Sequence, residues 1–221
     1  AFAGYAVAVD DAEFDAVLGD RPNQVDRLRE DVQPDGRALV DLRIEDAVVT
    51  DAGVRAGGGY AYVESYDYGA FTPEGTVPEH RLWQQLNLSH RSNAVAFLHR
   101  FRLEERWLGL PSASAPDTRD WTFQWRARYM LRTVVPLRGT PDRAGHVYAF
   151  GSDEIFVRFG ASQPTNLFDQ NRLQLGLGAS LASNVRLEAN WLNLLLLRGD
   201  GSQREVGNGL VLALTWNASL R

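Results

Sequence analysis

The 221-residue sequence contains no cysteine and no lysine, and all 23 of its basic residues are arginine. Without cysteine the chain has no disulfide framework, no thiolate metal site and no cysteine nucleophile. Without lysine it has no P-loop, no Schiff base and no lysine general base. Arginine in this excess fits either a GC-rich genome or sites that need its planar fork of donors. The positions of the arginines along the chain distinguish these explanations.

Long apolar runs are missing as well, and none approaches the ~18 residues of a transmembrane helix. No segment has the pattern of a signal peptide, although a processed N-terminus fits a chain that starts at Ala1. Residues 1–50 carry twelve acidic residues against five arginines, whereas residues 51–221 carry sixteen against eighteen. Neither part has the basic excess of a nucleic-acid-binding protein, so we expect no nucleic-acid partner.

The dominant pattern is an alternation of apolar and polar residues with a period of two. Between Trp121 and Thr133, Trp, Phe, Ala, Tyr and Leu alternate with Thr, Gln, Met and three arginines. Successive side chains of a β-strand point to opposite faces, so this segment predicts a strand with one apolar and one cationic face. The same alternation occurs near residues 38–44, 97–106, 172–181, 185–191 and 209–216.

Turn signals separate these segments. Ser92-Asn93 and Ser183-Asn184 predict tight hairpins, and Gly199 to Ser202 predicts another loop. We therefore expect a single all-β fold, an antiparallel up-and-down β-barrel of about 10 strands within a range of 8–12. Residues 37–221 form the barrel in this prediction. Residues 1–36 form an acidic N-terminal segment, with one strand or hairpin early on and a loop over residues 19–36, where one helical turn could lie around Val25 to Glu30.

The composition of the two faces indicates which of them points inward. A soluble barrel turns its apolar face inward, whereas a membrane barrel turns its apolar face to lipid and its polar face to the lumen. The polar faces here combine arginine with glutamate, glutamine and glycine and lack lysine, which is unusual for a surface in water. Arginine and glutamate facing each other across a lumen would form bidentate ion pairs. The pattern favours a membrane barrel over a soluble one.

Aromatic residues near the ends of the apolar faces support this interpretation. Tryptophan and tyrosine gather at the level of the headgroups in membrane proteins, where they form belts. The residues that we assign to such a belt are Trp107, Trp121, Trp125, Trp191 and Trp216, with Tyr148 beside them. The lipid bilayer of an outer membrane is therefore the first partner that we expect.

Several segments resemble a family of bacterial outer-membrane-type β-barrels that is known only as a domain of unknown function. The most specific segment runs from Asn166 to Leu173 and contains Phe-Asp-Gln-Asn-Arg; three further segments are Glu79-His80-Arg81, Phe101 to Trp107 and Asp153 to Phe156. The resemblance covers roughly residues 37–217 and implies an exported barrel of the Gram-negative envelope. It implies no activity, cofactor or catalytic residue. The chain departs from it in its first ~36 residues and in a C-terminus that does not end on an aromatic residue.

The strongest candidate site is the set of charged residues on the polar faces. It contains nine arginines and three glutamates: Arg100, Arg102, Arg106, Arg126, Arg128, Arg132, Arg158, Arg172, Arg186, Glu104, Glu154 and Glu188. A barrel of this size is nearly filled by its own side chains, so a wide porin is not expected. We interpret the set chiefly as a plug of ion pairs in the lumen. A lumen that attracts anions is the alternative.

The histidines and the N-terminal acidic residues are weaker candidates for a functional site. No two of the four histidines have the spacing of metal ligands, so neither a metal site nor a cofactor is expected. His80 could serve as a base between Glu79 and Arg81, and His99 lies on an apolar face. The acidic residues at positions 10, 11, 13 and 15 could bind a divalent cation but lack the pattern of a calcium loop.

Three functions remain open from the sequence. The favoured one is a structural or accessory barrel of the outer membrane that contacts other envelope proteins. The second is a narrow anion-selective channel or a binder of small anionic ligands. The third is an outer-membrane lipid hydrolase, because His90 and Ser92 match a His-x-Ser pattern in which histidine activates serine.

Overall fold

Strands make up almost all of the structure that can be described. The computed structural model describes residues 3–6, 28–33, 37–44, 53–65, 76–112, 118–141, 143–160, 167–198 and 201–216, and for the first three ranges it gives the course of the strands only. The strands are β1 (Ala3–Ala6), β2 (Leu28–Gln33), β3 (Arg37–Ile44), β4 (Val54–Ser65), β5 (Val77–Ser92), β6 (Val95–Pro111), β7 (Arg119–Arg138), β8 (Val147–Phe159), β9 (Phe168–Ala182), β10 (Val185–Arg198) and β11 (Gln203–Trp216).

All of these strands belong to one sheet. Its order is β1-β11-β10-β9-β8-β7-β6-β5-β4-β3-β2, so that β2 to β11 pair with their neighbours in the chain and β1 adds to β11. Every pairing from β2 to β11 is antiparallel, whereas β1 runs parallel to β11. The prediction of an all-β, antiparallel, up-and-down sheet is therefore confirmed, and the structure describes side chains in the eight strands from β4 to β11.

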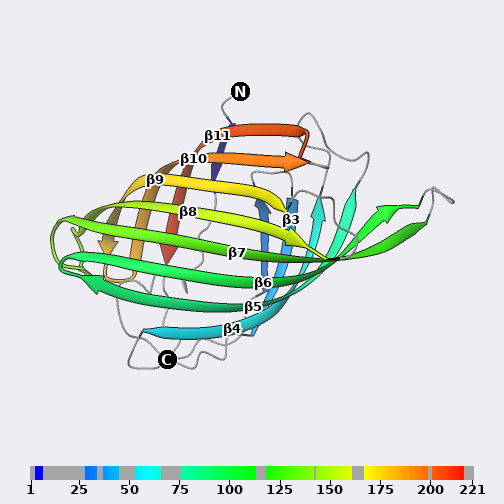
Figure 1. Ribbon diagram of the computed structural model, residues 1–221. Coiled ribbons are helices and arrows are strands. Elements are labelled where there is room, and N and C mark those ends of the chain that lie inside the picture. The colour runs from blue at the N-terminus through cyan, green and yellow to red at the C-terminus, as the bar shows by residue number, and fades with distance from the viewer. Residues whose placement is uncertain are drawn as a thin grey trace.

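The sheet differs from the expected barrel in two respects. The described residues contain eleven strands where we expected about ten. Within those residues β1 and β2 are the two edges of the sheet and do not pair, so the sheet is not closed. The sheet is nevertheless strongly curved, because its long strands bend toward the same side (Figure 1). One face is therefore concave, and its side chains converge.

The N-terminal part corrects one prediction. Residues 28–33 pair with β3 as a strand, where we expected a loop with one helical turn around Val25 to Glu30. The segment has no clear period, and the neighbouring strand overrides its weak local preference. The tripeptide Pro34-Asp35-Gly36 between the two strands is a turn signal that could have indicated the hairpin.

The two faces of the sheet have opposite polarity, as strand β7 illustrates. On its concave side Gln124, Arg126 and Arg132 are buried, whereas on the other side Trp121 and Tyr129 are exposed. Among the described residues, 20 polar or charged side chains are buried and 21 large hydrophobic ones are exposed, against 14 buried hydrophobic ones. The assignment of the two faces by the period of two is therefore correct, and the arginines lie on the buried face.

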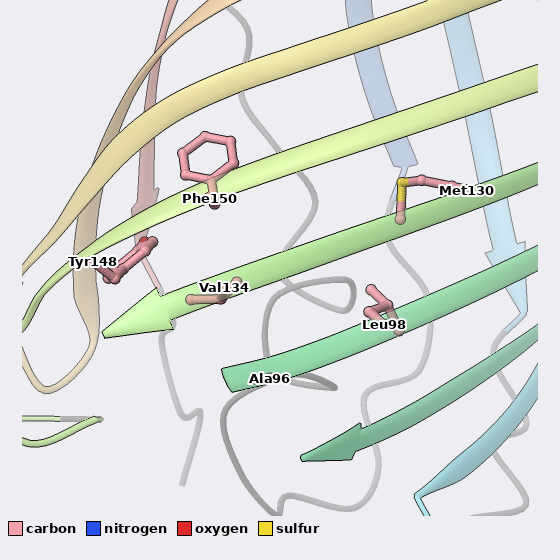
Figure 2. Close-up of a cluster of buried hydrophobic side chains, with 6 residues drawn as sticks. All are labelled: Ala96, Leu98, Met130, Val134, Tyr148 and Phe150. Atoms are coloured by element: carbon pink, nitrogen blue, oxygen red, sulfur yellow. The ribbon is translucent and has the colours of Figure 1, made fainter. Parts of the chain in front are cut away.

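The concave face carries a small apolar cluster at one end of the sheet. Leu98, Met130, Val134 and Phe150 are almost fully buried there, together with Ala96 and Tyr148 (Figure 2). At this end a short turn at residues 93–94 connects β5 to β6, and another at residues 183–184 connects β9 to β10. Both turns lie at predicted positions, and Asn93 adopts the left-handed conformation that asparagine tolerates in turns. We call this end of the sheet the turn end and the opposite end the loop end.

No helix in the described residues has the length and hydropathy needed to cross a membrane.

Candidate functional site: the charged inner face

The concave face brings together the charged residues that the sequence singled out. All twelve of the arginines and glutamates predicted for the lumen alternate with outward side chains on β6 to β10. One further arginine and two further carboxylates complete the set that we call the inner cluster. Its members are Glu79, Arg81, Arg100, Arg102, Glu104, Arg106, Arg126, Arg128, Arg132, Glu154, Arg158, Asp169, Arg172, Arg186 and Glu188.

Glu79 anchors the inner cluster near the loop end. Its carboxylate accepts two hydrogen bonds from Arg106, with Nε to Oε1 and Nη2 to Oε2 both at 2.7 Å. Arg81 donates from Nε to Oε1 of the same carboxylate at 2.7 Å, and the remaining guanidinium nitrogen of Arg106 reaches Gln124 Oε1 at 2.6 Å. The bidentate contact fixes both side chains in one geometry, as planar guanidinium and carboxylate groups allow.

Glu104 occupies the middle of the cluster. Arg126 Nε donates to its Oε2 at 2.5 Å, and Arg128 Nη1 donates to its Oε1 at 2.8 Å. Arg81 Nη1 lies 3.8 Å from the same Oε1, which links this group to Glu79. Glu104 has no exposed surface, so its charge depends on these three guanidinium groups.

Glu154 and Asp169 extend the network to β8 and β9. Arg128 Nη2 and Arg100 Nη2 lie 2.7 and 2.9 Å from Glu154 Oε1. Arg126 Nη1 lies 3.4 Å from Asp169 Oδ2, and Arg158 Nε lies 3.3 Å from Oδ1. One continuous chain of ion pairs therefore crosses the five neighbouring strands from β5 to β9.

Guanidinium groups pack against aromatic rings on the same face. The Phe156 ring, which is almost fully buried, has Arg128, Arg172 and Arg126 at 4.5, 5.1 and 5.4 Å from its centroid. Arg102 lies 4.5 Å from the ring of Trp83 and donates to Gln85 Oε1 at 2.8 Å. Cation–π contacts of this kind strengthen as water is excluded.

A second group of polar contacts lies toward the turn end. Arg132 Nη2 donates to Glu188 Oε1 at 2.6 Å, and the Tyr148 hydroxyl donates to the same oxygen at 2.8 Å. Arg132 also covers the ring of Phe150 at 4.1 Å. Arg132 and Glu188 are 56 residues apart, so this contact ties β7 to β10 across the concave side.

The Tyr148 ring depends on a glycine on β9. A Cβ atom added to Gly178 would lie 2.2 Å from Tyr148 Cζ and 2.4 Å from its hydroxyl oxygen. We expect Gly178→Ala to displace the ring, break its hydrogen bond to Glu188 and lower the free energy of unfolding by about 1–3 kcal/mol. The measurement is urea unfolding followed by tryptophan fluorescence. Gly207→Ala is the control because its Cβ would meet nothing closer than 3.8 Å; equal unfolding midpoints for both variants would contradict the packing.

Cations exceed anions in the inner cluster. It contains ten arginines and five carboxylates, so the face has the net positive charge that the sequence predicts. The sequence reasoning missed Glu79, Arg81 and Asp169, and including them lowers the ratio of arginines to carboxylates from three to one to two to one. The alternation of Glu79, Arg81, Trp83 and Gln85 with outward residues on β5 could have indicated the first two.

The predicted belt aromatics lie on the outer face, with one exception. Trp121, Trp191 and Trp216 are exposed, and Trp107 and Trp125 are half-buried. Trp107, Phe123, Trp125 and Phe159 form a row of ring contacts near the loop end, with centroids 5.2, 5.4 and 6.2 Å apart. Tyr148 is the exception, because it is fully buried on the concave face and bonded to Glu188.

Three histidines lie on the outer face. The hydroxyl of Tyr60 is 2.6 Å from His80 Nδ1, and the rings of Tyr62 and Trp121 pack around the same imidazole. His90 stacks on Phe97 and His99, whose Nδ1 lies 2.9 Å from the Tyr129 hydroxyl. In the described part of the chain no hydrogen bond joins His90 to Ser92, although both belong to β5.

Metal-binding groups are absent from the described residues, which contain no cluster of three histidine or acidic side chains placed to hold an ion. The acidic residues at positions 10, 11, 13 and 15 lie outside the described residues.

The fold and the inner cluster define a class of protein: an up-and-down antiparallel sheet with a charged, buried concave face and an apolar outer face. A profile of the family described as "Protein of unknown function (DUF2490)" matches residues 25–205. The chain therefore belongs to this family. The match begins before the segment from residue 37 that the resemblance covers. No curated protein and no solved structure matches the chain.

Proposed function

We propose that this protein is a β-barrel of the bacterial outer membrane. The observation that carries the proposal is the inverted polarity of the sheet, with charged side chains buried on the concave face and large apolar side chains exposed on the outer one. In water this arrangement leaves a large apolar area unburied, which monomeric soluble proteins avoid. In a membrane the outer face meets acyl chains and the inner face keeps its polar partners.

Closure of the sheet belongs to the same proposal. An open edge cannot persist in hydrocarbon, because its unpaired N–H and C=O groups would each cost several kcal/mol. We propose that the edges at β1 and β2 meet in the membrane and close the barrel. Among bacterial membranes the outer membrane is the one that holds such barrels, so the location that we propose is the Gram-negative envelope.

Within this proposal the barrel has a structural or accessory role and contacts other envelope proteins. The inner cluster supports this role because its ion pairs line the concave side from β5 to β9 in one continuous network. The apolar cluster of Leu98, Met130 and Val134 then blocks the turn end. A barrel that is filled in this way acts through its surfaces rather than through a passage.

The alternative function is a narrow anion-selective channel or a binder of small anions. The excess of arginine over carboxylate in the inner cluster favours it. The same excess makes the interior attractive to anions whether or not a passage exists. Lipid hydrolysis with His90 and Ser92 is a third hypothesis, which comes from the sequence pattern alone. A Ser92→Ala variant that hydrolyses lipid as fast as the wild type would reject it.

Planar-bilayer recording separates the first two functions. We expect the purified protein to insert without steady conductance, because charged and apolar side chains fill the interior. Anion-selective conductance that disappears in Arg126→Gln and Arg128→Gln variants would support the channel instead. Flotation with phospholipid vesicles tests the membrane proposal itself, and protein that stays in the dense fraction would contradict it.

A further inference from the structure

The outer face contains a hollow on β5 to β8. In the outward row of β7, Ala127 stands between the large side chains of Trp125 and Tyr129. Its register partners on the neighbouring strands are Leu103 and Val157. The missing side-chain volume at Ala127 leaves a groove of about 600 Å³ whose walls include Leu86, Phe101, Leu103, Tyr129, Ile155 and Val157. Such a volume lies within the ~300–1,000 Å³ of small-molecule sites, and its lining is mostly apolar, with Gln84, Gln85, Arg102 and Arg128 as its polar members.

An outward carboxylate lies next to the groove. Glu105 accepts a hydrogen bond from Gln84 Nε2 at 3.3 Å, and Gln84 itself lines the groove. The register partners of Glu105 on β5 and β7 are Leu82 and Trp125, neither of which carries charge. In the part of the chain that the structure describes, no arginine or histidine forms an ion pair with Glu105. Among the described residues, the carboxylate therefore has no counter-charge.

Aromatic residues are the neighbours of this carboxylate toward β7 and the loop end. Trp125 is its direct partner on β7, and Trp107 follows two residues later on the same face of β6. Phe123 lies between the two tryptophans, with ring centroids 5.2 Å from Trp107 and 5.4 Å from Trp125. The faces of aromatic rings attract cations, and a carboxylate does so more strongly. The combination of one carboxylate and several rings is thus complementary to an organic ammonium group.

The carboxylate with its aromatic neighbours and the apolar groove follow each other along the strands in the same order as the headgroup and the acyl chains of a phospholipid. The row of aromatic rings is near the loop end, at the level proposed for the headgroups, and Ala127 and Tyr129 follow it along β7 toward the turn end. We propose that the groove binds one phospholipid with a primary ammonium headgroup, whose ammonium pairs with Glu105 while one acyl chain lies over Ala127. This inference rests on the proposed membrane location.

The test measures which lipid the protein retains. The full chain is refolded into vesicles of equimolar phosphatidylethanolamine and phosphatidylglycerol, extracted in mild detergent and examined by native mass spectrometry. We expect the wild type to retain phosphatidylethanolamine about fivefold over phosphatidylglycerol, which corresponds to ~1 kcal/mol at 25 °C. Glu105→Gln should bring the ratio close to one. Ala127→Phe should fill the groove and reduce retention of both lipids to background.

Two matched variants control for general effects. Asp153→Asn removes a different outward carboxylate of the apolar face, and Ala149→Phe enlarges a small outward residue of β8 that does not line the groove. Both should retain lipid as the wild type does. A wild type without headgroup preference, or a preference that survives Glu105→Gln, would overturn the proposal. So would a dimer that Ala127→Phe converts to a monomer, since a second copy would then cover the groove.

Failure of the proposal and failure of the membrane location give different results. A protein that does not float with vesicles contradicts the membrane location and the lipid site together. A protein that floats with vesicles but shows no headgroup preference contradicts the lipid site alone.

Discussion

Replacing Glu104 by glutamine is expected to lower the free energy of unfolding by about 3–5 kcal/mol. The carboxylate is fully buried and holds Arg126 at 2.5 Å and Arg128 at 2.8 Å. Glutamine keeps the shape but removes the negative charge, so the guanidinium groups of Arg126, Arg128 and Arg81 remain buried with less compensation. Breaking a buried pair costs more than the pair contributes, because one partner stays desolvated.

The measurement is urea unfolding of protein refolded in phosphatidylcholine vesicles, followed by tryptophan fluorescence. Glu105→Gln is the matched control: it changes the same group one residue away but on the outer face, and we expect a loss of no more than ~1 kcal/mol. If Glu104→Gln fails to refold, the double variant Glu104→Leu with Arg126→Met should restore folding, since hydrophobic replacement of a buried pair is often tolerated. A single variant as stable as the control would contradict the role of the inner cluster.

The second large effect concerns the outer face. We expect Leu212→Arg to destabilise the protein in vesicles by about 2–4 kcal/mol, because it would place a charge on a lipid-facing position of β11. Leu212 is 59% exposed and lies between the equally outward Leu210 and Leu214. In a water-soluble protein the same change at such an exposed position would alter stability by no more than ~0.5 kcal/mol.

Gln203→Arg is the control for this variant, because Gln203 lies at the beginning of the same strand and is exposed. Its midpoint of urea unfolding should equal that of the wild type. Equal midpoints for Leu212→Arg and the wild type would contradict a lipid-facing outer surface.

Much of this fold is predictable from the period of two. The alternation over residues 121–133 correctly separates an exposed face containing Trp121 from a buried one containing Arg126 and Arg132. It works because a strand has only two faces, so that each residue's face follows from its parity. The prediction is weaker on β5, where Trp83 points inward among polar side chains and Gln84 points outward.

Contacts between distant strands are not predictable in this way. The ion pair of Arg132 with Glu188 joins β7 to β10, and it depends on the curvature of the sheet and on the space above Gly178. The apolar cluster also escapes the pattern, because Met130 and Val134 share the inward face of β7 with arginines. Period and composition assign a face, whereas register and packing decide what each side chain touches there.

Strand β2 shows a further limit of prediction from the sequence. Leu28–Gln33 contains four polar or charged residues and no regular alternation, yet it pairs with β3 along its whole length. Pairing with an existing strand supplies the backbone hydrogen bonds that local propensity does not predict.

The most direct test of the inverted polarity uses the absence of cysteine. Single cysteines can be introduced at residues 210 to 215 one at a time and spin-labelled without background reaction. In phospholipid vesicles we predict that labels at the even positions are more accessible to oxygen, which concentrates in the bilayer, than to an aqueous nickel complex. Labels at the odd positions should be shielded from oxygen. Even-numbered labels that are more accessible to nickel than to oxygen would contradict the account.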